Sequence, residues 1–261
     1  MASFPEVLAG AVAAGGGRAV TVPATWHQGR TAYGGFSAAL ALDEAQRVGG
    51  GEMPPLRSAQ ISMIAPLFGN VEVSAQVVRR GRNATWVEAR IVGEMGLGLT
   101  ASFVFMGPIE SALAVDRQAM PEDVIAPGEA STLSRERGAV FLRNNFEVRF
   151  ARPKMPERVP EMCWWVRLDD RAGLDPMVEL LLCADALPPG AMSILGPSVP
   201  VSTMQWHVNA LTARPETRDG WWLLRSTGDY AHAGCSSQTM ALWNGQGESV
   251  AAGMQSIALF G

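Results

Sequence analysis

The sequence is poor in charged residues, cysteine and histidine. Charged residues make up 18% of the 261 positions and hydrophobic residues 48%, whereas soluble domains typically carry ~25% charged residues. So large an apolar fraction excludes intrinsic disorder. Because 21 Lys plus Arg are outnumbered by 25 Asp plus Glu, the chain has no basic excess with which to neutralise a phosphate backbone, and we expect no nucleic-acid partner.

Its three cysteines, Cys163, Cys183 and Cys235, are too few and too scattered for a disulfide framework or a Cys-x-x-Cys metal site. The three histidines show no ligand spacing, and no phosphate-binding glycine loop is present, so we expect neither a metal nor a cofactor. The N-terminus has no basic region and carries Glu6 early, unlike a secretory signal. We therefore expect a cytoplasmic protein.

Two similar successions of elements follow one another along the chain. In the first, an Ala- and Leu-rich segment predicts an apolar helix over 34–48, and strand-like runs follow at 58–67, 70–81, 83–93 and 98–106. In the second, strand-like runs precede and follow a helix that starts after Asp175; the runs lie at 140–150, 162–168, 200–211, 220–230, 233–245 and 248–259. Residues 107–139, rich in Pro, Gly and charge, read as a linker.

The recurrence indicates a duplication. Setting 58–67 against 203–211 places Ser58 opposite Thr203. An apolar helix followed by an antiparallel meander, stated twice, predicts an α+β fold, the tandem or double hotdog: two antiparallel sheets, each wrapped around a central helix and joined into one continuous sheet. The expected parts are an N-terminal hotdog (1–106), the linker (107–139) and a C-terminal hotdog (140–261).

Asp185 is the residue that the sequence singles out for chemistry. It follows an apolar run and precedes 28 residues without a charged side chain. Carboxylates are seldom buried without a partner or a purpose, although a carboxylate that caps a loop or pairs with an arginine would leave the same pattern. Prolines and glycines in the uncharged stretch break any membrane-spanning helix, so we expect no membrane contact.

Several segments resemble the type II acyl-CoA thioesterases, the double-hotdog thioesterases. The segment 26–45, with Tyr33-Gly34-Gly35 at the expected helix start, resembles the approach to that family's first hotdog helix, and 56–91 resembles the strands that follow. In the second half, CADAL, VSTMQW and VAAGMQS resemble the three places where the family keeps an Asp, a Thr and a Gln that hold the hydrolytic water. The resemblance assigns these roles to Asp185, Thr203 and Gln255.

The resemblance implies hydrolysis of acyl-CoA to the free acid and CoASH by water that an aspartate activates. Backbone N–H groups of Gly34 and Gly35 are the candidate donors to the developing oxyanion, as a helix start with glycines can supply. Tyr33, His207 and Arg82 are the candidate substrate-binding residues, the arginine through the CoA phosphates. Chain length of the acyl group, and CoA against a carrier-protein thioester, stay open.

Two other functions fit the same fold. A hotdog hydratase or dehydratase acting on an enoyl thioester would need a His and Asp pair, and His207 is the histidine nearest to Asp185 in the sequence. A non-catalytic acyl-thioester binding protein would keep the fold and lose turnover. Adjacent tryptophans in the strands, at 164–165 and 221–222, should send one ring of each pair outward, which predicts a homodimer.

Overall fold

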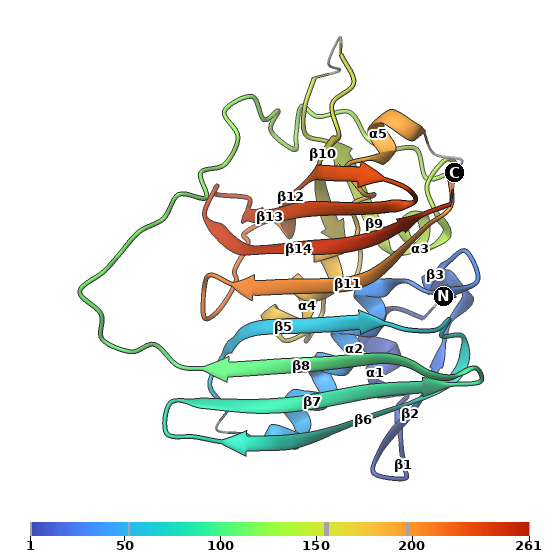
Figure 1. Cartoon of the computed structure of the whole chain (residues 1–261), viewed down its shortest axis with the longest axis vertical. Coiled ribbons are helices and arrows are strands. Elements are labelled where there is room, and N and C mark those ends of the chain that lie inside the picture. Colours follow the sequence, from blue (N-terminus) through green and yellow to red (C-terminus); the bar gives the residue numbers. More distant parts are fainter. Residues whose placement is uncertain (1, 52, 154–156, 197–198, 261) are drawn as a thin grey trace.

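One continuous antiparallel sheet of twelve strands runs through the molecule (Figure 1). The computed structural model describes residues 2–51, 53–153, 157–196 and 199–260. The first half contains, in chain order, α1 (Phe4–Ala9), β1 (Val12–Ala14), β2 (Gly17–Val22), the 3₁₀ turn η1 (Ala24–Trp26), β3 (His27–Gln28), β4 (Thr31–Ala32), α2 (Gly34–Gly49), β5 (Leu56–Met63), β6 (Gly69–Arg80), β7 (Ala84–Gly93) and β8 (Gly96–Met106).

The second half repeats this plan. It contains α3 (Val140–Asn145), β9 (Phe146–Phe150), β10 (Glu161–Leu168), α4 (Pro176–Ala184), α5 (Met192–Leu195), β11 (Val201–Ala210), β12 (Trp221–His232), β13 (Cys235–Asn244) and β14 (Ser249–Leu259). The strand order is β1-β2-β6-β7-β8-β5-β11-β14-β13-β12-β10-β9, so the halves mirror each other about the β5–β11 pair. The double hotdog predicted from the sequence is confirmed.

Three β-bulges fall at corresponding places in the two halves. The unpaired residues are Arg57, Val78 and Gly98 in the first half and Met204, Asp229 and Val250 in the second. Because Leu56 and Thr203 each stand directly before a bulge, Leu56 is the counterpart of Thr203. The sequence alignment with Ser58 was therefore wrong by two residues, a shift that the period of two along a strand cannot reveal.

The two central helices pack antiparallel on one face of the sheet (Figure 1). At one end Gln46 of α2 donates to Asp175, the N-cap of α4, at 3.2 Å. At the other end the first turn of α2 meets the last turn of α4, where Gly35 leaves no room for a side chain: a Cβ would lie 2.6 Å from the Leu182 carbonyl oxygen. This glycine therefore sets how closely the halves approach.

The segment 140–150, predicted as a strand, begins as the helix α3 and becomes strand β9 only at Phe146. Asn144 and Asn145 donate back to the carbonyls of Val140 and Phe141 at 2.7 and 2.9 Å. The Phe141 ring also stacks on Tyr33, with 4.0 Å between ring centroids. Tertiary packing has overridden the local strand preference here.

The linker covers the tryptophans that were expected to form a subunit interface. Trp164 and Trp222 pack into the main core beneath the helices, whereas Trp165, Trp221 and Trp243 form a second cluster on the opposite face. Linker residues pack on this cluster, and the Trp165 Nε1–H donates to the Ile125 carbonyl at 2.8 Å. These rings are buried by the same chain, so they no longer argue for a dimer.

Among the residues that the structure describes, none of the helices combines the length and the apolar character that a membrane span requires.

We predict that Trp165→Ala lowers the free energy of unfolding by ~3–5 kcal/mol, because a large cavity would open under the linker. Trp86 is the matched control: it is another strand tryptophan, but 38% of it is exposed, so Trp86→Ala should cost less than ~1 kcal/mol. Urea unfolding measures both. Equal, small losses would mean that the linker does not hold the second cluster.

Candidate active site

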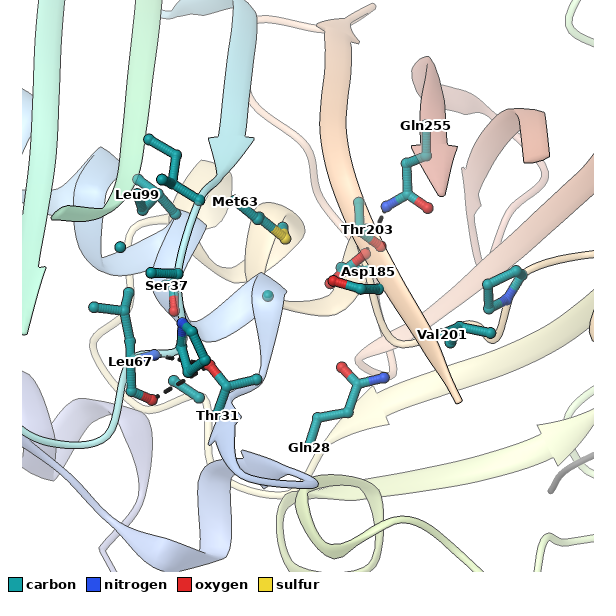
Figure 2. A pocket seen from close by; sticks show the side chains of 18 of the residues that line it. Gln28, Thr31, Ser37, Met63, Leu67, Leu99, Asp185, Val201, Thr203 and Gln255 are labelled. Atoms are coloured by element: carbon teal, nitrogen blue, oxygen red, sulfur yellow. Dashed lines mark hydrogen bonds between the residues drawn. The ribbon is translucent and has the colours of Figure 1, made fainter. Parts of the chain in front are cut away.

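A cavity of about 180 Å³ opens where the halves meet, and both halves line it (Figure 2). The first half contributes Gly34 and Ser37 from α2, together with Met63 at the end of β5 and the residues 64–67 that follow it. The second half contributes Asp185, Thr203 and Gln255. The structure thus brings together the three residues that the thioesterase resemblance selected, and sets them beside the start of α2.

Asp185 ends α4 as its C-cap. Its Oδ1 accepts a hydrogen bond from Gln255 Nε2 at 2.6 Å (Figure 2). Burial raises the pKa of this carboxyl from 3.8 to about 7, while the hydrogen bonds from Gln255 and from the backbone of Gly35 act in the opposite direction. Desolvation is therefore the stronger effect, and the carboxyl changes charge near neutral pH.

Gln255 is 3% exposed on β14, and its amide is bonded at both ends. While its Nε2 donates to Asp185, its Oε1 accepts from Gln238 Nε2 at 2.7 Å, and Gln238 Oε1 accepts from the Gly190 backbone N–H at 2.9 Å. The sequence analysis missed Gln238. The signal was available, since a glutamine precedes the apolar run TMALW of a buried strand.

Thr203 reaches the cavity because of the bulge at Met204. In a regular strand, residues three apart face opposite sides. The extra residue brings Thr203 to the side occupied by the buried Trp206, which pairs with Gln255 across β11 and β14. A strand irregularity thus aims a polar side chain at a site, as bulges often do.

The two glycines at the start of α2 play different parts. Gly34 lines the cavity, and a Cβ there would collide with Oδ2 of Asp185, so the missing side chain keeps this carboxylate oxygen accessible. Gly35 does not line the cavity, and its backbone N–H acts to lower the pKa of the Asp185 carboxyl. The positive end of the α2 dipole therefore faces Asp185.

The structure does not bring the three candidate substrate-binding residues to this cavity. Tyr33 is fully buried, and its hydroxyl donates to the Leu182 carbonyl at 2.9 Å, which burial in the helix contact requires. His207 follows the inward Trp206, so it faces the other side of the sheet, where its Nε2 lies 3.2 Å from the Ser58 hydroxyl. Arg82 lies in the β6–β7 turn, at the opposite end of the strands from Met63 and the cavity (Figure 1).

The corresponding place in the first half is apolar. Leu56 stands where the second half has Thr203, and the pairings of β8 and β7 put Phe103 in place of Gln255 and Val87 in place of Gln238. All three apolar side chains are buried. The duplicated fold therefore carries this polar constellation once.

The possible metal ligands and one buried cysteine of the described part of the chain bear on two other kinds of chemistry. No group of three or more His, Cys, Asp or Glu side chains there could hold a metal ion. Burial raises the pKa of the Cys163 thiol to about 12, which leaves it protonated at neutral pH.

The raised pKa of Asp185 predicts a pH-dependent stability. Between about pH 4 and 7 the folded chain keeps a proton that the unfolded chain has lost, so the free energy of unfolding falls as the pH rises through this window. Asp185→Asn removes this loss. The free energy of unfolding of the variant should exceed that of the parent by ~2–4 kcal/mol above pH 7 and by much less near pH 4.

Urea unfolding across this pH range checks the prediction, with Asp116→Asn, an exposed linker carboxylate, as the control. If the difference in the free energy of unfolding between the parent and Asp185→Asn does not change with pH, the prediction is wrong.

Two family models match the chain, one in each half. Residues 22–106 match the profile of the acyl-CoA thioesterase N-terminal domain, and residues 119–259 match that of the acyl-CoA thioesterase C-terminal domain. No protein among the curated sequences matches the chain.

Solved structures share the fold at low sequence identity. A conserved protein of unknown function with a hot dog fold from Alicyclobacillus acidocaldarius is 19% identical, with a TM-score of 0.84 over 98% of this chain and 97% of that one. The tesB protein of Mycobacterium avium subs paratuberculosis is 20% identical, with a TM-score of 0.77 over 99% of each chain. The dehydratase domain of RzxB from Pseudomonas fluorescens is more distant, at 13% identity and a TM-score of 0.56 over 95% and 96%.

Proposed function

Since the chain belongs to the acyl-CoA thioesterase family, we propose that it hydrolyses acyl-CoA to the free acid and CoASH with a water molecule that Asp185 deprotonates. One observation carries the proposal: a carboxyl whose pKa is raised to about 7 lies in a cavity, fixed by Gln255, beside a helix N-terminus. A general base works best when its pKa lies near the working pH.

The two carboxylate oxygens of Asp185 have separate tasks in this proposal. Oδ1 is held by Gln255, whereas Oδ2 lies toward Gly34 and accepts the proton of the water. The Thr203 hydroxyl, in the same cavity wall, orients that water by a hydrogen bond. Met63, Leu67 and Leu99, on the other side of the cavity in Figure 2, offer apolar contacts to the acyl group.

The reaction needs no covalent intermediate with the protein. As Asp185 takes the proton, the water oxygen bonds to the thioester carbonyl carbon, and the carbonyl oxygen becomes negative. The C–S bond then breaks, and the thiolate receives the proton from Asp185, giving acid and CoASH. We propose the Gly34 N–H at the α2 terminus as the oxyanion donor, because Gly34 lines the cavity whereas Gly35 does not.

The hydratase alternative would need a histidine paired with the aspartate at the cavity. Among the described residues that line the cavity there is no histidine, and His207 faces away from it. A non-catalytic binding protein is separated from a hydrolase by one assay. Release of free thiol from a panel of acyl-CoAs shows hydrolysis, loss of enoyl absorbance without thiol shows hydration, and a binding protein shows neither. The homodimer and the cytoplasmic location stay predictions.

We expect Asp185→Asn to lower turnover by at least ~100-fold, the usual effect of losing a general base. The parent's kcat/KM should fall at acid pH with an apparent pKa near 7, because only the ionised carboxylate accepts a proton. Thr203→Ala should lose activity without losing stability. Thiol release measured from pH 5 to 9 tests the three expectations about activity, urea unfolding tests the stability of Thr203→Ala, and Asp116→Asn is the control in both. Parental rates in Asp185→Asn would refute the role of the carboxylate.

A further inference from the structure

Gln238 is a buried polar side chain that the proposed chemistry does not use. It is 0% exposed on β13, opposite Gln255 on β14, and it does not line the cavity. Both ends of its amide are bonded: Nε2 donates to Gln255 Oε1 at 2.7 Å, and Oε1 accepts from the Gly190 N–H at 2.9 Å. A chain of hydrogen bonds thus leads from a backbone donor to Asp185.

This chain has a direction that its first member imposes. A backbone N–H can only donate, so Gln238 must turn its oxygen to Gly190 and its NH₂ to Gln255. Gln255 must then turn its oxygen to Gln238, which leaves its NH₂ for the carboxylate. We infer that Gln238 is a positioning residue that holds the Gln255 amide in the orientation that donates to Asp185, a role that rests on the proposed function.

The donor at the start of the chain is tightly placed. A Cβ on Gly190 would collide with the Pro160 carbonyl oxygen and would lie 2.8 Å from the Gly228 nitrogen. The Gly228 N–H in turn donates to that same carbonyl at 2.7 Å. The backbones of Pro160 and Gly228 thus pack directly against Gly190, where its N–H donates to Gln238.

The orientation matters because the NH₂ end and the oxygen end of an amide have opposite effects on the pKa of a carboxyl. An NH₂ group donates to the ionised form and favours it, whereas an amide oxygen repels that form and accepts only from a protonated carboxyl. Without Gln238 the Gln255 amide is free to reverse. The pKa of Asp185 would then rise further, and less of the base would be ionised at neutral pH.

Gln238→Met tests this role by keeping the length of the side chain and removing both hydrogen bonds. The acid limb of kcat/KM for acyl-CoA hydrolysis should move up by at least ~1 pH unit, a tenfold loss of activity on that limb, while activity partly recovers at alkaline pH. A residue that served structure alone would lower the rate equally at all pH values. The matched control is Ser236→Ala: Ser236 is also buried on β13, and its hydroxyl has no partner among the described residues.

Gln238→Glu is a second test variant, to be used if Gln238→Met folds poorly. A protonated carboxyl at this position donates to Gln255 as the amide does, but an ionised one cannot. Where that carboxyl is ionised, kcat/KM should therefore stay below that of the Ser236→Ala control, because the carboxylate turns the Gln255 NH₂ away from Asp185. An unchanged acid limb in folded Gln238→Met, or a Gln238→Glu profile that matches the Ser236→Ala control at every pH, overturns the inference. Failure of the proposed function would show differently, as no thiol release by the parent.

Discussion

The contact between the first turn of α2 and the last turn of α4 is the constraint on which the site depends. Gly35 permits it, because a Cβ there would press on the Tyr33 hydroxyl at 2.5 Å and on the Leu182 carbonyl at 2.6 Å. The contact carries Asp185 to the positive end of the other half's helix and removes it from bulk solvent. Since the carboxylate and the helix start come from different halves, the site exists only when both are packed together.

A symmetric framework here supports an asymmetric site. Both halves keep the same strand order and the same three bulges. The second half nevertheless buries the amides of Gln238 and Gln255 where the first has Val87 and Phe103. Buried amides are tolerated only when their donors and acceptors are bonded, and the backbone of Gly190 supplies the first of those bonds.

Much of this protein was determined by the sequence itself. The apolar segment expected at 34–48 is the helix α2 over Gly34–Gly49, and each strand expected after the two central helices is present. These elements could be predicted because their hydrophobic periodicity is local. Asp185 stood out for a local reason too, as a lone charge in an apolar stretch. Thr203 and Gln255 came from the resemblance, since no single-sequence pattern distinguishes them from other polar strand residues.

Tertiary structure decided what depends on contacts between distant segments. It selected the helix α3 in place of a strand and laid the linker over Trp165. It placed His207 on the far side of the sheet, because one bulge residue resets which side chains face inward. Register is hidden from the sequence, since a shift of two residues leaves strand alternation unchanged. The raised pKa of Asp185 and the direction of the Gln238 amide follow from packing, because burial and hydrogen-bond partners arise only when the halves meet.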